Sequence, residues 1–124
     1  MRRIFVMMIV AMSGYVNAHQ WTPTYPELTP SYVEGILEAK MVLFNKREEV
    51  EYYEIDVFDA EWNPIPFASQ SKLVQIRYLE TKAVSVFIRK QDQKRAMYIC
   101  TRSRLKKDDV KSTVISSRIC SKIK

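Results

Sequence analysis

Histidine and glycine are almost absent from this 124-residue chain, and both absences limit its chemistry. A single histidine, His19, provides neither the Ser-His-Asp triad of many hydrolases nor the histidine pair of an acid–base ribonuclease. One histidine and two cysteines also make a poor zinc site. Only Gly35 follows residue 18, so there is no glycine-rich loop for a nucleotide phosphate. We therefore expect a protein that is not an enzyme and holds no cofactor and no metal.

Long apolar runs are also scarce, and the one that stands out lies at the N-terminus. Arg2 and Arg3 precede an apolar stretch over residues 4–12, which is too short to cross a bilayer as a helix. Val16-Asn17-Ala18 then supplies the residues that a signal peptidase reads. The pattern predicts a signal peptide over residues 1–18 and a periplasmic or secreted protein without a transmembrane segment. A buried N-terminal strand or an uncleaved anchor is the alternative.

The two cysteines, Cys100 and Cys120, both follow the predicted signal peptide. An exported chain with two cysteines usually pairs them, so we predict a disulfide, with two free buried thiols as the alternative. A tight hairpin near Lys106 would place Cys100 opposite a residue near 113. A bridge to Cys120 therefore requires a longer loop.

The formal net charge is +6, and it falls to 6 − 2 = +4 when the two arginines of residues 1–18 are removed. Acidic residues are concentrated over residues 48–56 and basic residues over residues 89–107. Exposed strands usually carry such charges, so solvated strand faces are the simpler interpretation, and a molecule with two charged faces is the other. The export signal argues against nucleic acid as a partner.

Short segments of alternating or continuous apolar residues dominate the rest of the chain. Residues 19–33 contain three prolines with Trp21 and Tyr25, which is typical of an extended N-terminal arm. Residues 34–124 are expected to form one all-β domain, an immunoglobulin-like antiparallel β-sandwich of about seven strands, with a small barrel as the alternative. The expected strands are residues 36–44, 50–58, 65–68, 73–78, 83–89, 97–101 and 113–120. A turn with Trp62 and Asn63-Pro64 follows the second strand.

Four segments of the sandwich carry a resemblance to a known family. They are Val42-Leu43-Phe44-Asn45, the alternating stretch from Tyr53 to Asp59, the turn from Trp62 to Phe67, and the strand from Val84 to Arg89. Together they resemble the N-terminal domain of PapD-like periplasmic pilus chaperones. That family has two sandwich domains, and this chain has room for one. The resemblance implies an immunoglobulin-like fold and a chaperone that lends an edge strand to an incomplete partner.

These observations predict a non-catalytic exported binding module, one form of which is a chaperone-like assembly helper that acts through an edge strand. Its partner would be an envelope, pilus-like or phage structural protein. Alternatives are a structural component of an envelope or phage assembly that docks through its N-terminal arm, and a small secreted inhibitor. The candidate contact residues are Trp21, Tyr25, Trp62, Val114, Ser116 and Arg118, of which Trp62 could equally close the end of the sandwich.

Overall fold

The structure is a computed structural model that describes residues 19–104 and 117–124. The predicted signal peptide, residues 1–18, lies outside the described residues. Nine strands and one short 3₁₀ turn make up the regular structure of the described part. They are β1 (Gln20–Thr22), β2 (Thr29–Pro30), β3 (Ile36–Phe44), β4 (Tyr52–Phe58), β5 (Ala68–Ser69), β6 (Leu73–Gln75), β7 (Thr81–Arg89), η1 (Lys90–Asp92), β8 (Tyr98–Arg104) and β9 (Arg118–Lys122).

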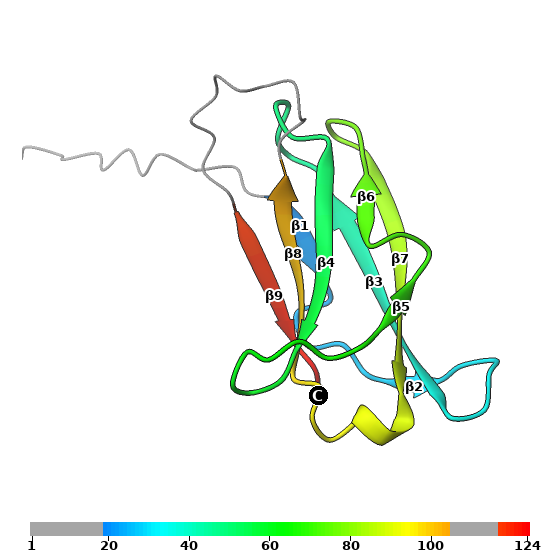
Figure 1. Ribbon diagram of the computed structural model, residues 1–124. Coiled ribbons are helices and arrows are strands. Elements are labelled where there is room, and N and C mark those ends of the chain that lie inside the picture. The colour runs from blue at the N-terminus through cyan, green and yellow to red at the C-terminus, as the bar shows by residue number, and fades with distance from the viewer. Residues whose placement is uncertain (1–18, 105–116) are drawn as a thin grey trace, which may run out of the picture.

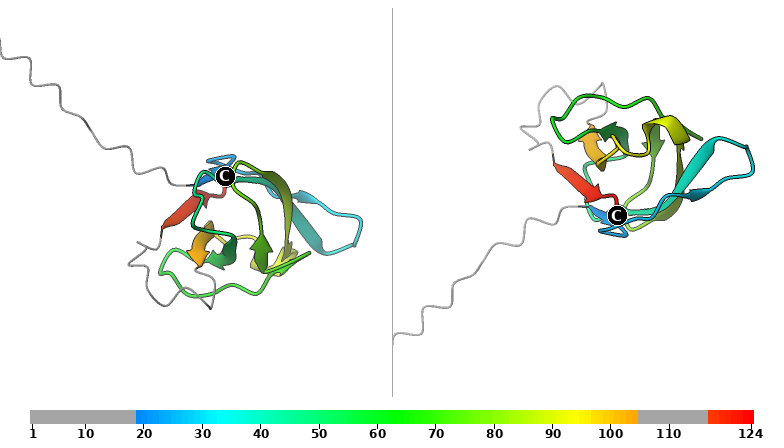
Figure 2. Two further views of the ribbon diagram at one scale, coloured as in Figure 1. Left: turned by 90° about the horizontal axis from the view of Figure 1, so that it is seen from above. Right: turned by 90° about the horizontal axis from the view of Figure 1, so that it is seen from below.

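The strands form two antiparallel sheets that pack face to face (Figure 1). One sheet has the order β1-β3-β7-β5, with β2 also paired to β3, and the other has the order β6-β4-β8-β9. Views from above and below show that the β2–β3 hairpin projects beyond the sandwich (Figure 2). The predicted fold class, an immunoglobulin-like β-sandwich, is confirmed.

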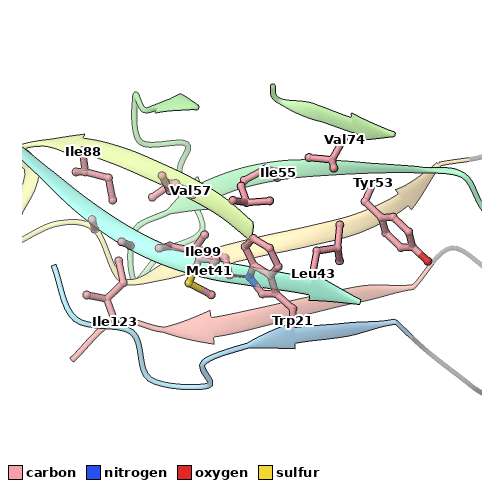
Figure 3. Close-up of a cluster of buried hydrophobic side chains, with 14 of the residues drawn as sticks. Trp21, Met41, Leu43, Tyr53, Ile55, Val57, Val74, Ile88, Ile99 and Ile123 are labelled. Carbon is pink, nitrogen blue, oxygen red and sulfur yellow. Dashed lines mark hydrogen bonds between the residues drawn. The ribbon is translucent and has the colours of Figure 1, made fainter. Parts of the chain in front are cut away.

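Alternating apolar residues of both sheets form the core, as the sequence pattern predicts. Tyr53, Ile55 and Val57 of β4 point inward, and each is at most 1% exposed. Val84, Val86 and Ile88 of β7 belong to the same buried cluster from the other sheet, and Figure 3 shows Ile88 among them. Because side chains alternate between the two faces of a strand, the residues between them lie on the outer surfaces.

The predicted N-terminal arm is largely part of the sandwich. β1 pairs with the C-terminal half of β3, and β2 pairs with its start. Trp21 points into the core, is 4% exposed, and donates an indole hydrogen bond to the carbonyl of Ile99 at 3.0 Å (Figure 3). Tyr25, in contrast, is 60% exposed in the connection between β1 and β2.

Several predicted strand boundaries differ from the structure. The strand predicted at residues 65–68 is reduced to an isolated bridge between Phe58 and Pro64 and the two-residue β5, which begins at Ala68. Pro66 between them has no N–H group to donate to a strand ladder. The strand predicted at 73–78 ends at Gln75, and its last residues form a turn in which Leu79 has a φ of 63°. The strand predicted at 113–120 lies partly outside the described residues, and its described part belongs to β9, which extends to Lys122. The predicted strand at 97–101 extends to Arg104.

Candidate protein-binding face

The outward side chains of the sheet β6-β4-β8-β9 form a surface that we call the outer face. Strand pairing sets these side chains in rows, because residues opposite each other share a face. One row contains Phe58, Tyr98 and Lys122. The row of Glu54, Arg102 and Arg118 lies four residues farther along the strands. The outer face therefore combines aromatic rings with basic side chains from its edge strand β9.

An aromatic cluster occupies the end of the outer face nearest the β4–β5 turn. The indole of Trp62 is stacked on Tyr98, with ring centroids 4.4 Å apart and planes 3° from parallel. Trp62 also contacts Phe58, whose ring centroid lies 5.8 Å away. The guanidinium of Arg118 lies over that same phenyl ring at 5.1 Å, in the geometry of a cation–π contact. One face of an aromatic pair and a neighbouring cation are thus presented together.

The turn that carries Trp62 is held rigidly by Asp59. Its carboxylate accepts hydrogen bonds from the backbone N–H groups of Glu61 at 2.9 Å and Asn63 at 2.8 Å. These bonds hold the pKa of Asp59 below its usual value, the backbone bond from Asn63 contributing most. Trp62 itself has a φ of 65°, a left-handed conformation that is rare for bulky residues. The exposed indole, 49% of whose surface is accessible, is therefore fixed in place.

The carboxylates of the outer face differ in their environments. Glu54 pairs with Arg104 at 2.5 Å and with Arg102 at 3.5 Å. Asp56 is half-buried, and desolvation, followed by repulsion from Glu54, raises its pKa. Two carboxylates on one strand are a feature of acid–base sites. Here Glu54 forms ion pairs with two arginines, and Asp56 is half-buried. The arrangement is that of an ion-paired strand face.

The disulfide between Cys100 and Cys120 lies on the same face and joins β8 to β9. The two residues stand directly opposite each other in the strand ladder, with a Cα–Cα distance of 4.0 Å. The predicted pairing is thereby confirmed, and it has the longer β8–β9 connection that the sequence required. The bond fixes the edge strand β9 to the sheet.

Loss of this disulfide should destabilise the protein substantially. The bond closes a loop of 20 residues, for which loop entropy predicts about 3 kcal/mol of stability. The double variant C100A/C120A should therefore lose about that amount in urea unfolding. Reductant should bring the wild-type protein to the same stability and leave the variant unchanged. Equal stability of the oxidised protein and the variant would contradict the account.

On the side away from β8, β9 lies near β1 of the other sheet but is not paired with it as a strand. The carbonyl of Ser117 accepts from the N–H of Ser103, and the N–H of Ile123 donates to Met97, so odd-numbered residues face β8. Even-numbered residues direct their backbone N–H and C=O groups away from β8. The backbone N–H groups of Lys122 and Lys124 donate to the carbonyls of Thr24 and Pro26. Among the described residues, no strand pairs with the outward N–H and C=O groups of Arg118 and Cys120. This pair is the open part of the edge.

The predicted contact residues are thus distributed unevenly. Trp62 and Arg118 are brought together around Phe58 on the outer face. Trp21 is a core residue, and its burial removes it from the candidate contacts. Tyr25 is exposed elsewhere, and the predicted contacts Val114 and Ser116 lie outside the described residues.

Sequence reasoning did not find a buried polar cluster at the end of the sandwich beside residue 19. The imidazole of His19 is 2% exposed, lies 2.6 Å from the hydroxyl of Thr101 and packs on the ring of Tyr53 at 4.4 Å. Burial, followed by repulsion from Arg47, lowers the pKa of His19 to about 4. The phenol of Tyr53 donates to Asn45 at 2.6 Å, and burial raises its pKa to about 12. These groups tie strands together and are closed to solvent.

Residues 19–104 and 117–124 contain no group of three or more His, Cys, Asp and Glu side chains arranged to hold a metal ion. Within these ranges, no helix has the length and apolar character needed to span a membrane.

Comparisons with known proteins agree with the fold. No family model matches the chain, and no curated protein matches it in sequence. Among solved structures, the periplasmic chaperone SfaE matches with a TM-score of 0.54 and 13% identity, over 86% of this chain and 56% of that one. A FixG-related protein from Vibrio parahaemolyticus matches with a TM-score of 0.46 and 17% identity, over 87% of this chain and 96% of that one. The chain thus spans little more than half of the chaperone, and the predicted resemblance to PapD-like chaperones is confirmed at the level of fold.

Proposed function

We propose that this protein is an exported, non-catalytic binding module that helps another envelope protein to assemble. Its edge strand β9 pairs with an extended strand of that partner, a mode of recognition in which backbone hydrogen bonds supply the affinity. The partner is an envelope, pilus-like or phage structural protein. Because natural proteins usually block their sheet edges, an edge strand whose outer side is only partly paired favours a binding role.

The open backbone at Arg118 and Cys120 is the observation that carries this proposal. Trp62 and Arg118 lie on the adjoining outer face, where they can contact side chains of the added strand. Aromatic residues and arginine are the residues that most often dominate binding energies at protein interfaces. The edge of β9 and the outer face therefore form one continuous contact surface.

Export is supported by three observations. Residues 1–18 have the charge, apolar length and terminal small residues of a signal peptide. The disulfide fits an oxidising compartment. The structurally similar chaperone SfaE is periplasmic. We infer that the mature protein begins at His19 and works in the periplasm or outside the cell.

A proline at position 118 tests the role of the β9 backbone. Arg118→Pro removes an outward N–H, at an edge position where proline is tolerated, whereas Arg118→Ala removes only the side chain. Loss of one backbone hydrogen bond should weaken binding of the partner about tenfold more in Arg118→Pro than in Arg118→Ala. Affinity is measured by biolayer interferometry with the partner recovered from periplasmic extract.

Thermal unfolding of the two variants provides the folding control for this comparison. Both should unfold at similar temperatures, because the N–H of residue 118 points away from β8. Equal affinities of two folded variants would show that the β9 backbone does not bind the partner.

The N-terminal connection gives the second candidate function, docking into a larger assembly. Tyr25 is 60% exposed there, and Tyr32 and Val33 are fully or largely exposed at the tip of the projecting β2–β3 hairpin (Figure 2). If these residues made the main contact, Tyr25→Ala would abolish partner binding and Arg118→Pro would not.

A further inference from the structure

The sheet edge formed by β7 and β5 lies on the opposite side of the sandwich from β9. β3 pairs with β7 along its whole length, from Thr81 to Arg89. On the other side of β7, β5 pairs only with Phe87 and Val86. The first half of β7, residues 81–85, therefore has no neighbouring strand on that side among the described residues.

The backbone of this half-strand points outward at alternate residues. The N–H of Asn45 bonds to the carbonyl of Glu80, and the N–H of Lys90 bonds to Gly35, so even-numbered residues of β7 face β3. Thr81 and Ala83 consequently direct their N–H and C=O groups away from the sheet. No described residue is bonded to these groups.

A groove of about 530 Å³ runs beside this free edge, between β7 and β6. β6 is the last strand of its sheet, the first half of β7 extends past β5 in the other sheet, and Figure 1 shows β6 and β7 along the same side of the molecule. Val74 and Val84, which are almost completely buried, contribute apolar surface to the groove, and Leu73 is 49% exposed at its rim. The groove thus offers apolar surface next to unpaired backbone.

Two side chains donate to carbonyls that the backbone N–H groups of an added strand could otherwise reach. The hydroxyl of Ser69 donates to the carbonyl of Ser85 on β7 at 2.9 Å. From the other direction, the ammonium of Lys82 reaches across the groove and donates to the carbonyl of Gln75 on β6. Each carbonyl lies at a sheet margin and is satisfied by a flexible side chain. A charged lysine at an edge also discourages unwanted pairing between copies of the protein.

We propose that this groove is a second strand-binding site, which receives an extended polypeptide segment of about five residues antiparallel to β7, as a continuation of β5. The segment pairs with Thr81 and Ala83 and displaces Lys82 from Gln75. Its side chains alternate, with apolar residues facing Val74 and Val84 and polar residues facing solvent. An extended chain is the occupant because only a strand matches unpaired backbone groups spaced along an edge. The site does not depend on the proposed role of β9.

A phage-displayed library of random linear peptides, selected on the purified wild-type protein, tests this site. Ala83→Pro removes the outward N–H, and the matched control Ala83→Ser keeps it. Selected peptides should alternate apolar and polar residues and bind Ala83→Pro at least tenfold more weakly than Ala83→Ser. Arg118→Pro should bind them as the wild type does, and Lys82→Ala should bind them a few-fold more tightly because the carbonyl of Gln75 is freed.

Amide hydrogen exchange of the wild-type complex keeps the test independent of how well the proline variant folds. Bound peptide should slow exchange at Thr81 and Ala83 at least tenfold and leave Arg118 unchanged. The proposal is overturned if selection gives no binder. Protection that appears away from β7, or peptides that lose affinity for Arg118→Pro instead, would also overturn it.

Discussion

Replacement of Asn45 by alanine is expected to lower the free energy of unfolding by about 4 kcal/mol, because four buried or half-buried groups lose their partner. The amide of Asn45 donates to the carbonyls of Val50 at 2.6 Å and Ile76 at 3.2 Å. Its oxygen accepts from the N–H of Arg47 at 2.9 Å and from the phenol of Tyr53 at 2.6 Å. One fully buried side chain thus connects the end of β3 to β4 and to the residue after β6.

The matched control for this prediction is Asn63→Ala. Asn63 is exposed in the turn after β4, where its side chain makes a single hydrogen bond, to Asp59 at 3.3 Å. Its replacement should cost less than about 1 kcal/mol. Urea unfolding followed by tryptophan fluorescence measures both variants. If Asn45→Ala were no less stable than Asn63→Ala, the interior amide would not hold these strands together.

Stability is expected to fall as the pH decreases from 6.5 to 4, because His19 is buried in its neutral form. Burial lowers the pKa of His19 to about 4 in the folded protein, from 6.5 for an unperturbed histidine. The unfolded chain therefore binds a proton over this range that the folded protein does not, and the full stabilisation is present only above pH 6.5. The difference in pKa corresponds to a loss of about 3 kcal/mol by pH 4.

His19→Gln isolates this effect from the carboxylates, which also titrate in acid. Glutamine retains hydrogen-bonding groups towards Thr101 and Ser117 but cannot be protonated. The variant should be less stable than the wild type at pH 7, and the difference between the two should shrink as the pH falls to 4. Parallel stability profiles over this range would show that His19 is not held neutral by the fold.

The sequence was sufficient to predict the layers of the fold and much of the core. β3 has the predicted bounds, and the inward set Tyr53, Ile55 and Val57 follows directly from strand alternation. A period of two is a strong signal where one face of a sheet is buried. Strand ends were harder to predict, because Leu79 adopts a positive φ without glycine chemistry to indicate it.

Strand ends that carry charged residues, and the burial of polar side chains, were also difficult to predict. β8 continues through Arg102 and Arg104 because Glu54 on β4 pairs with both guanidinium groups. That pairing depends on register, which the sequence does not specify. For the same reason the burial of His19 and Asn45 was not predicted, since their partners come from segments distant in the chain.

The candidate contact surface was predicted in part. Trp62 and Arg118 were identified singly, and only the fold shows that both contact Phe58. Trp21 lies in a proline-rich segment that has the pattern of an arm, but it belongs to β1 and its indole is buried in the core. An aromatic residue near prolines is compatible with both situations, so the sequence could not separate them.

Site-specific photocrosslinking in cells tests the proposed function most directly. A photoreactive amino acid replaces Arg118 on the edge strand β9 or, as a control, the exposed Lys40 on the other sheet. We predict that irradiation joins position 118, and not position 40, to a protein of the periplasm or envelope. The absence of an adduct at 118, or equal adducts at both positions, would contradict the assignment of β9 as the edge that binds a partner.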